Sequence, residues 1–500
     1  MRGIATAQIS AGAKTCVLVG PLDAVPALDL SDYESILWFS GNQTWMPPSV
    51  AVDYRRIAVE KPERFTIERA SSALDRLIQR DALRLPSIFV TEKAMVDTSG
   101  RFLPVVETIV AQCERHGRAR LTRQQVGFAW QSHLLANLPA YARRRVPAAW
   151  AGALAGVPAF VCGSGPSLET SGEKLAAFAD RAVVFAADSA LVALDRRGIA
   201  ADFAVTVDAT KLPEKCLPAG RMPSRLLAAS ISPPAWRHAF ADDAAGFISG
   251  NQITENWLAN LGLARTTIGV AGNCGITALE LAIHLGCGPI YLFGMDHALD
   301  ANGSGRLHQR ETAERPAGEE TLQGGGEYPK VPGNYQENVA TPFLREWRML
   351  DARCAELSPG LVFNVTDRGA RLSNTTLVAP AAFALSTDAL DKSARLASLA
   401  PWASIDDATW RGIVAAVRGA TDTVEPLVAQ ARAALQDGDE ADAIRVLKDA
   451  FREKTFGQLM GSYGLKAIPH LLQPSAGNRA LWTTLVDECV QLLALAKGLA

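Results

Sequence analysis

The sequence predicts an α/β protein: a Rossmann-like parallel sheet domain in the centre, a small α/β domain before it and an all-α domain after it. Four observations support this prediction. From residue 158 onward, short apolar runs alternate with helical stretches at the pace of strand–helix–strand units. A shorter alternation fills the first 115 residues, and after residue 384 the chain is rich in Ala and Leu without strand signals. A chain of 500 residues is also too long for one compact core.

Residues 1–115 are predicted to form the small α/β domain. Four apolar runs have the length and composition of buried strands, and a polar stretch before the last run has amphipathic helical spacing. The strands are expected at 15–20, 35–41, 56–60 and 85–91, and the helix at 71–84. Residues 116–150 are predicted to be a helical linker to the next domain.

Residues 151–384 are predicted to form the Rossmann-like domain. Strands are expected at 159–163, 182–188, 203–208, 225–232, 246–250, 266–272, 289–296 and 361–366. In such a sheet, ligands bind beyond the carboxyl ends of the strands, where the topology switches direction. The polar, glycine-rich segment 300–338 is longer than an inert connection, and loops of that length are usually functional or disordered. Residues 385–500 are predicted to form the all-α domain.

Composition excludes several classes of protein. The formal net charge of −2 gives no basic field for nucleic acid, and no apolar run approaches the roughly 20 residues of a membrane span. The apolar part of the first 20 residues is short and broken by polar residues, unlike a signal peptide. Eight scattered cysteines without a CxxC motif indicate buried thiols in a reducing compartment, so the protein is expected in the cytoplasm.

A glycine-rich turn, FVCGSGPSLE at 160–169, follows the first strand of the predicted central sheet. Gly163 and Gly165 would let the main chain approach a ligand, and Pro166 suits the first turn of a helix. Ser164 and Ser167 add hydroxyl groups. A helix start offers free N–H groups and a positive dipole end, which favour phosphate. The alternative is a plain strand-to-helix turn, since the pattern matches neither the GxGxxG fingerprint nor the P-loop.

Polar residues also stand at the ends of three other predicted strands. They are Asp188 with Ser189, Asp208, and Asp296 with His297. A carboxylate at the end of a buried strand is costly to desolvate without a partner, although each one alone could cap the following helix. Several such ends in one sheet, beside a glycine turn, favour a shared site.

Asn273 and two histidines are further candidates for this site. Asn273 precedes a predicted helix within GVAGNCGITALE, where it could bind a sugar or base or serve as the helix N-cap. His297 and His308 flank the start of the long loop, and a histidine there could act as general base. No HxH or HExxH spacing accompanies them, so no metal site is predicted.

Four motifs occur in a fixed order between about 155 and 375: VCGSGPSLE, AADSALVALDRRGIAADFAVTVD, AGNCGITALELAIHLGCGPIYLFGMDHALD and NVTDRGARL. In this order they resemble the motility-associated factor family of bacterial flagellin glycosyltransferases. The middle of the chain also resembles archaeal 6-hydroxymethylpterin diphosphokinases and bacterial sialyltransferases with a G-x-G-P-S-L turn. Members of the flagellin family carry an N-terminal domain and a helical C-terminal domain, as predicted here.

The resemblance implies an enzyme, a glycosyltransferase that moves a nonulosonic, sialic-acid-like sugar from CMP to Ser or Thr of flagellin. It implies that residues 163–168 hold the CMP-sugar, and that a histidine base and a tyrosine pair assist, for which His308, Tyr328 and Tyr335 are suitable. Asp296 with His297 or His308 is the expected proton-transfer group. A CMP donor has one bridging phosphate, so no metal or other cofactor is obligatory.

Two alternatives remain at this point. The first is a diphosphotransferase acting on a pterin with ATP and Mg²⁺, for which Asp188, Asp208 and Asp296 could supply oxygen ligands. The second is a non-catalytic flagellin-binding protein that keeps a transferase fold.

Overall fold

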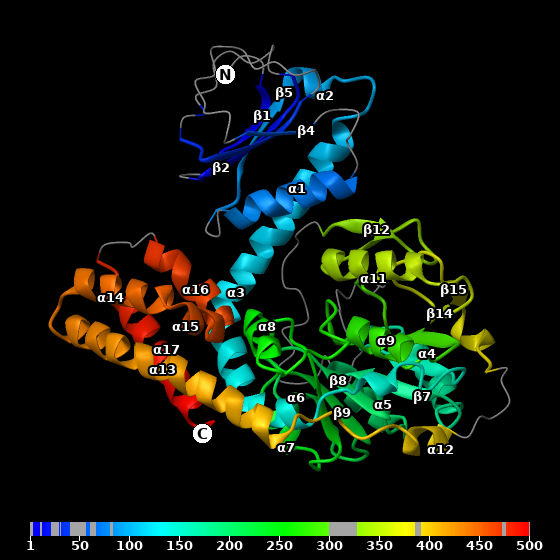
Figure 1. Ribbon diagram of the computed structural model, residues 1–500. Coiled ribbons are helices and arrows are strands. Elements are labelled where there is room, and N and C mark those ends of the chain that lie inside the picture. Colours follow the sequence, from blue (N-terminus) through cyan, green and yellow to red (C-terminus); the bar gives the residue numbers. More distant parts are fainter. Residues whose placement is uncertain are drawn as a thin grey trace. The chain divides into compact units, whose positions relative to one another are not determined.

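The computed structural model describes residues 4–10, 13–21, 30, 32–40, 57–60, 67–80, 84–299, 328–385, 392–472 and 477–499. The chain divides into two compact units (Figure 1). The first contains residues up to 127 together with 465–476, and the second contains 128–464 together with 477–500. Each unit is built on its own β-sheet.

The first unit contains a five-stranded sheet in the order β1-β5-β2-β3-β4. Its edge strand β1 is antiparallel to β5, whereas the other neighbours are parallel. All four expected strands are present, and β1 is an addition that the sequence reading missed. The strands are β1 (Ile4–Gln8), β2 (Thr15–Val19), β3 (Ser35–Phe39), β4 (Ile57–Glu60) and β5 (Ser87–Thr91), with helices α1 (Ile67–Arg80) and α2 (Glu92–Met95).

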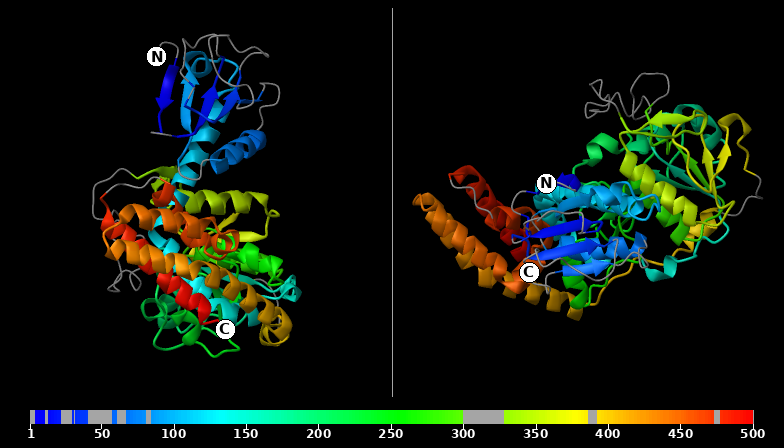
Figure 2. Two further views of the ribbon diagram at one scale, coloured as in Figure 1. Left: turned by 60° about the vertical axis from the view of Figure 1, so that its left-hand side comes forward. Right: turned by 90° about the horizontal axis from the view of Figure 1, so that it is seen from above.

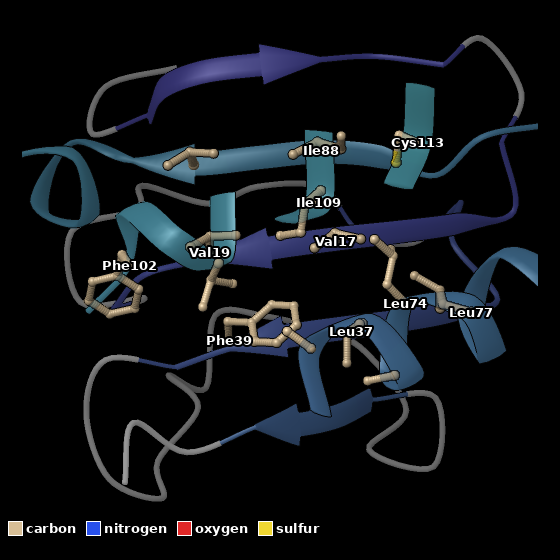
Figure 3. Close-up of a cluster of buried hydrophobic side chains, with 14 of the residues drawn as sticks. Val17, Val19, Leu37, Phe39, Leu74, Leu77, Ile88, Phe102, Ile109 and Cys113 are labelled. Atoms are coloured by element: carbon tan, nitrogen blue, oxygen red, sulfur yellow. The ribbon is translucent and has the colours of Figure 1, made fainter. Parts of the chain in front are cut away.

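Successive side chains along β2 and β3 point to opposite faces of the sheet, and both faces are buried. Val17 and Val19 point into the core beneath α1 and the first part of α3, together with Leu37 and Phe39 (Figure 3). The intervening residues, with Phe89 of β5, belong to a second cluster. Strands buried on both faces appear as continuous apolar runs, which is why the sequence predicted them well.

Helix α3 (Leu103–Arg143) is one continuous helix, so the predicted helical linker starts earlier than residue 116. A short 3₁₀ turn, η4 (Ala148–Trp150), follows it. The boundary between the two units falls within this helix.

The second unit is built on an eight-stranded parallel sheet in the order β10-β9-β8-β7-β6-β11-β14-β15. The predicted Rossmann-like sheet is therefore confirmed. Its strands are β6 (Ala159–Cys162), β7 (Val183–Ala187), β8 (Phe203–Thr206), β9 (Arg225–Ala229), β10 (Ala245–Ile248), β11 (Ile290–Phe293), β14 (Val362–Val365) and β15 (Thr376–Val378).

Helices pack against this sheet, among them α9 against β6, β7 and β8, and α4 against β11 (Figure 1). The helices between the strands are α4 (Leu168–Ala176), η5 (Asp188–Ala190), α5 (Leu191–Arg196), α6 (Pro213–Cys216), α7 (Ala235–His238), α8 (Ile253–Asn260), α9 (Cys274–His284) and α11 (Leu344–Glu356). The 3₁₀ turn η6 (Pro380–Ala382) follows the last strand. The core of this unit is rich in aromatic rings. Phe185, for example, stacks on Phe203 with 5.1 Å between the ring centroids.

The expected strand at 266–272 is wrong. This segment makes one isolated bridge, between Ser249 and Gly269, beyond the edge strand β10. Asn251 occupies the space beside Gly269, where a Cβ would lie 2.5 Å from its amide oxygen. The sequence did not predict the hairpin of β12 (Lys330–Pro332) and β13 (Asn338–Ala340). Its first strand lies within the polar segment 300–338, and its second strand begins at the end of that segment.

The C-terminal region is helical, as predicted. It contains α12 (Lys392–Ala397), α13 (Asp407–Gln436), α14 (Glu440–Arg452), α15 (Lys454–Leu459), α16 (Gly461–Leu472) and α17 (Arg479–Lys497). Helices α13, α14 and α17 pack together, and Figure 2 shows α13 and α14 side by side. None of the described helices is long and apolar enough to cross a bilayer. All eight cysteines are buried free thiols, as expected.

Adjacent residues of α3 give a test of the first unit's core. Ile109 is 1% exposed within the cluster of Figure 3, whereas Val110 is 44% exposed. Ile109→Ala should destabilise the sheet by about 2–5 kcal/mol, because it leaves a cavity. Val110→Ala should stay within about 0.5 kcal/mol. Native-state hydrogen exchange of the β2 and β3 amides measures the loss of stability in each variant. Equal losses in Ile109→Ala and Val110→Ala would contradict this packing.

Candidate active site

The glycine-rich turn lies where the topology of the central sheet reverses. From β6 the chain adds β7, β8, β9 and β10 on one side, then returns to place β11, β14 and β15 on the other. The turn follows β6, and the segment beginning at Gly294 follows its neighbour β11. This is the ligand-binding position that the sequence predicted for such a sheet.

Three N–H groups of this turn, those of Gly163, Gly165 and Ser167, already have acceptors within the protein. Gly163 donates to Phe293 O and Gly165 donates to Gly294 O, both at 2.8 Å. Ser167 N–H donates to Asp296 Oδ2 at 2.7 Å. A carboxylate thus occupies the start of α4, where we had expected the phosphate of a ligand. The turn is therefore bound mainly to the β11 end of the sheet.

The glycines are required by this close packing. A Cβ at Gly165 would lie 2.5 Å from Asp296 Oδ2 and 2.7 Å from Gly294 O. A Cβ at Gly163 would lie 2.5 Å from Gly294 O. Backbone oxygen atoms cannot move aside cheaply, so any side chain would push the two segments apart. The contact explains both glycines without a ligand.

Asp296 is buried, with 4% of its surface exposed. Its second oxygen, Oδ1, lies 3.3 Å from Thr366 Oγ1 on the loop after β14. The one proton of that hydroxyl has a second acceptor, the Arg368 carbonyl oxygen, at 2.9 Å. Burial raises the pKa of Asp296, and the hydrogen bonds from Ser167 and the charge of Arg368 oppose this. These contacts make Asp296 a link between three loops, from β6, β11 and β14.

A second group of contacts surrounds Asp188, which is 1% exposed. One oxygen, Oδ1, accepts from Ser189 N–H at 2.7 Å, and Oδ2 accepts from Thr206 Oγ1 at 3.0 Å and Cys274 Sγ at 3.1 Å. The Ser189 hydroxyl donates to Ser164 Oγ at 2.9 Å. Asp188 therefore joins the ends of β7 and β8, the start of α9 and the glycine turn.

Lys211 supplies the positive charge of this group. Its ammonium nitrogen lies 3.2 Å from Asp188 Oδ1, and 34% of its side chain is exposed. The negative charge of Asp188 raises the pKa of Lys211, so the side chain stays charged. Asp208 follows strand β8, in the loop that also contains Lys211. Its carboxylate accepts hydrogen bonds from the backbone N–H and the hydroxyl of Thr210.

His297 and Asn273 form a third contact. Asn273 is the N-cap of α9, and its Oδ1 accepts from Ile276 N–H at 2.9 Å. Its Nδ2 lies 3.5 Å from His297 Nε2, while His297 Nδ1 lies 3.0 Å from Met295 O. A carbonyl can only accept, so Nδ1 carries the proton and Nε2 presents a lone pair. Burial lowers the pKa of His297, which favours this neutral form.

The remaining predicted residues are less closely connected. Tyr335, in the loop of the β12–β13 hairpin, is 53% exposed and donates to Thr366 O at 3.0 Å. Tyr328 lies just before β12 and is half-buried. Pro166 lies within the turn, ahead of α4. His308 falls outside the described residues.

Sequence reasoning missed Lys211, Thr366 and Arg368. Lys211 follows Asp208 in the loop after a predicted strand of the same sheet, which is the signal that could have identified it. Arg368 lies in the quoted NVTDRGARL motif, pairs with Asp367 at 2.8 Å and acts on Asp296 through its charge. Within the described part of the chain, no three His, Cys, Asp or Glu side chains group in a way that could hold a metal ion.

Comparison with known proteins gives two similarities. Residues 132–302 match a family model described as 6-hydroxymethylpterin diphosphokinase MptE-like. The fold is similar to that of a MAf glycosyltransferase from Magnetospirillum magneticum AMB-1, with 16% identity and a TM-score of 0.57 over 97% of this chain and 78% of that one. No curated protein matches the chain. The middle of the chain is thus similar to MptE-like domains. The resemblance seen in the motifs is confirmed as a similarity of domain and of fold.

The packing of the glycine turn can be tested by stability. Gly165→Ala should destabilise the second unit by about 1–3 kcal/mol, because the new methyl group meets the Gly294 carbonyl and the Asp296 carboxylate. Gly419→Ala in α13 is the control, since a Cβ there meets no atom within 4 Å and alanine favours helix by about 0.5–1 kcal/mol. Urea unfolding measures both. A Gly165→Ala variant as stable as the wild type would show that the turn has room.

Proposed function

We propose that this protein is a glycosyltransferase that transfers a nonulosonic sugar from a CMP donor to Ser or Thr of flagellin. The observation that carries the proposal is the fold. The likeness to a MAf glycosyltransferase extends over 97% of the chain and so includes the parts on both sides of the MptE-like domain. The eight free, buried thiols support a cytoplasmic location.

The geometry supports His297 as the general base. Its Nε2 lone pair is available because Nδ1–H is held by Met295 O, and the Asn273 amide can rest against it until an acceptor hydroxyl replaces that contact. In the proposed step, the hydroxyl proton moves to Nε2 and the hydroxyl oxygen bonds to the anomeric carbon. The bond from that carbon to the CMP phosphate oxygen breaks, and its electron pair stays on the phosphate.

Asp296 is assigned a different role from the one we expected. One of its oxygens accepts a hydrogen bond from Ser167 N–H, and the other lies 3.3 Å from the Thr366 hydroxyl. The Ser167 bond, at 2.7 Å, ties this carboxylate to the start of α4. We therefore propose Asp296 as a positioning residue that fixes the glycine turn beside His297. His308 remains a candidate base outside the described residues.

A diphosphotransferase remains the second candidate, because residues 132–302 match an MptE-like model. That reaction would need Mg²⁺ near the phosphates of ATP. The three carboxylates considered for Mg²⁺ have separate partners, with Asp188 at Lys211, Asp208 at Thr210 and Asp296 at Ser167. The arrangement therefore supports the sugar transferase more than the diphosphotransferase.

Nucleotide binding separates the two candidates. Calorimetric titration with CMP, CDP and ATP, each with and without Mg²⁺, should give CMP binding that does not require the metal. Mg²⁺-dependent ATP binding without a response to CMP would instead support the diphosphotransferase. Binding of flagellin with no response to any nucleotide would support the non-catalytic alternative.

The role of His297 can be measured with His297→Asn, because asparagine tolerates the positive φ of 46° at this position. Loss of the base should lower kcat for flagellin glycosylation, followed by intact mass, by about 10²–10⁴-fold. His284→Asn, at the opposite end of α9, is the control and should retain the wild-type rate. A wild-type rate in His297→Asn would remove it as the base.

The pH dependence of stability gives an independent readout. His297 has a lowered pKa in the folded protein, so the unfolded chain takes up a proton first as the pH falls below about 6.5. The free energy of unfolding should therefore fall as the pH falls from about 6.5 towards that lowered pKa. His297→Asn should show a smaller fall in urea titrations between pH 7 and 5. An unchanged slope would show that His297 is not held neutral by the fold.

A further inference from the structure

Lys211 has a partly open position at the carboxyl edge of the central sheet. It lies in the loop after β8, and its ammonium nitrogen is 3.2 Å from Asp188 Oδ1. The carboxylate is buried, but 34% of the lysine side chain is exposed. An ammonium has three N–H donors. Among the described residues, Asp188 is the side chain that accepts from it, which leaves donor capacity on the exposed side.

The ammonium is also linked to the glycine turn through hydrogen bonds. Lys211 and the backbone N–H of Ser189 donate to the same oxygen, Asp188 Oδ1. The hydroxyl of Ser189 then donates to Ser164 within the turn. Lys211 is thus connected to the switch-point turn through one carboxylate and one serine.

A second lysine–aspartate pair in the same unit has a structural role and serves for comparison. Lys392 lies 2.7 Å from Asp202, which precedes β8 at the amino edge of the sheet. Both side chains are enclosed there, with 12% and 11% exposed. Asp202 also accepts from Val184 N–H. The pair at the carboxyl edge differs because its cation is partly exposed, at the end of the sheet where ligands bind.

The glycine turn needs such a cation if it is to bind an anionic donor. The N–H groups of Gly163, Gly165 and Ser167 donate to the protein, and the Asp296 carboxylate lies at the start of α4. These contacts cannot stabilise a ligand phosphate, and the carboxylate would repel it. A fixed positive charge nearby offsets that repulsion.

We propose that Lys211 binds an anionic group of the donor, and that Asp188 holds its ammonium in place. The anion is either the phosphate of the nucleotide or the carboxylate of a nonulosonic sugar. The inference rests on the proposed function and adds the residue that recognises the charge of the donor.

The experiment compares matched variants that remove each pair completely. Lys211→Met alone leaves a buried carboxylate unpaired and could prevent folding. The double variant Lys211→Met with Asp188→Asn avoids this, and Lys392→Met with Asp202→Asn is the control. Lys211→Arg keeps the charge. Urea unfolding verifies that each protein is folded, and calorimetry at constant salt measures binding of cytidine, CMP and CMP-nonulosonic acid.

A contact with phosphate should weaken CMP binding by about ten- to a hundredfold in the Lys211 double variant and leave cytidine binding unchanged. A contact with the sugar carboxylate should leave CMP binding unchanged and weaken binding of the complete donor by a similar factor. In both cases the Lys392 double variant should bind as the wild type does, and Lys211→Arg should restore part of the loss.

Wild-type affinities for CMP and the donor in a folded Lys211 double variant would overturn the proposal. An equal loss in the Lys392 double variant would also overturn it, because the effect would then be one of stability. If the wild type binds Mg²⁺–ATP and not CMP, the proposed function fails, and the same variants test Lys211 on the ATP phosphates. A wild type that binds none of these ligands would overturn both.

Discussion

The close approach of two loops, 163–167 and 294–296, is the constraint on which the candidate site depends. Two backbone hydrogen bonds and the Ser167–Asp296 bond join them across the switch point of the central sheet. Gly163, Gly165 and Gly294 permit the approach, since a Cβ at any of them would lie within 2.5 Å of an oxygen atom across the contact. The carboxyl edges of the two halves of the sheet are thereby fixed relative to each other, before any ligand arrives.

Helix α9 holds His297 and Asp188, the other two groups of the site, at the same edge of the sheet. Its N-cap, Asn273, faces His297 after β11, and its first residue, Cys274, donates to Asp188 after β7. One rigid element therefore sets the separation of the proposed base from the proposed anion-binding lysine. Rigid placement of this kind is what transfer chemistry requires, because its catalytic groups act only from a fixed geometry. The neutral imidazole of His297 and the Lys211–Asp188 pair are thus both connected to the N-terminal end of α9.

Much of the fold was predictable because the strands are buried on both faces. Such strands are continuous apolar runs, and all the expected ones formed except 266–272, which extends past an edge strand and makes a single bridge. The short strands β12, β13 and β15 escaped notice, since three residues in a polar context carry too little pattern. The polar residues at strand ends were also identified correctly as neighbours of one edge. Their hydrogen-bond partners were not, because these come from residues such as Thr366 that are distant in the sequence.

The sequence by itself determined that a parallel sheet would bring the glycine turn, Asp188, Asp296 and His297 to the same edge, since strand order along the chain and the direction of parallel strands require it. Only the tertiary structure decided what each residue does there. It placed the Asp296 carboxylate at the start of α4, where a phosphate had been expected, and Lys211 beside Asp188. The local sequence pattern shows which residues are polar. It does not show that Ser167 N–H donates to Asp296, because that bond joins residues 129 positions apart and depends on how the two segments pack.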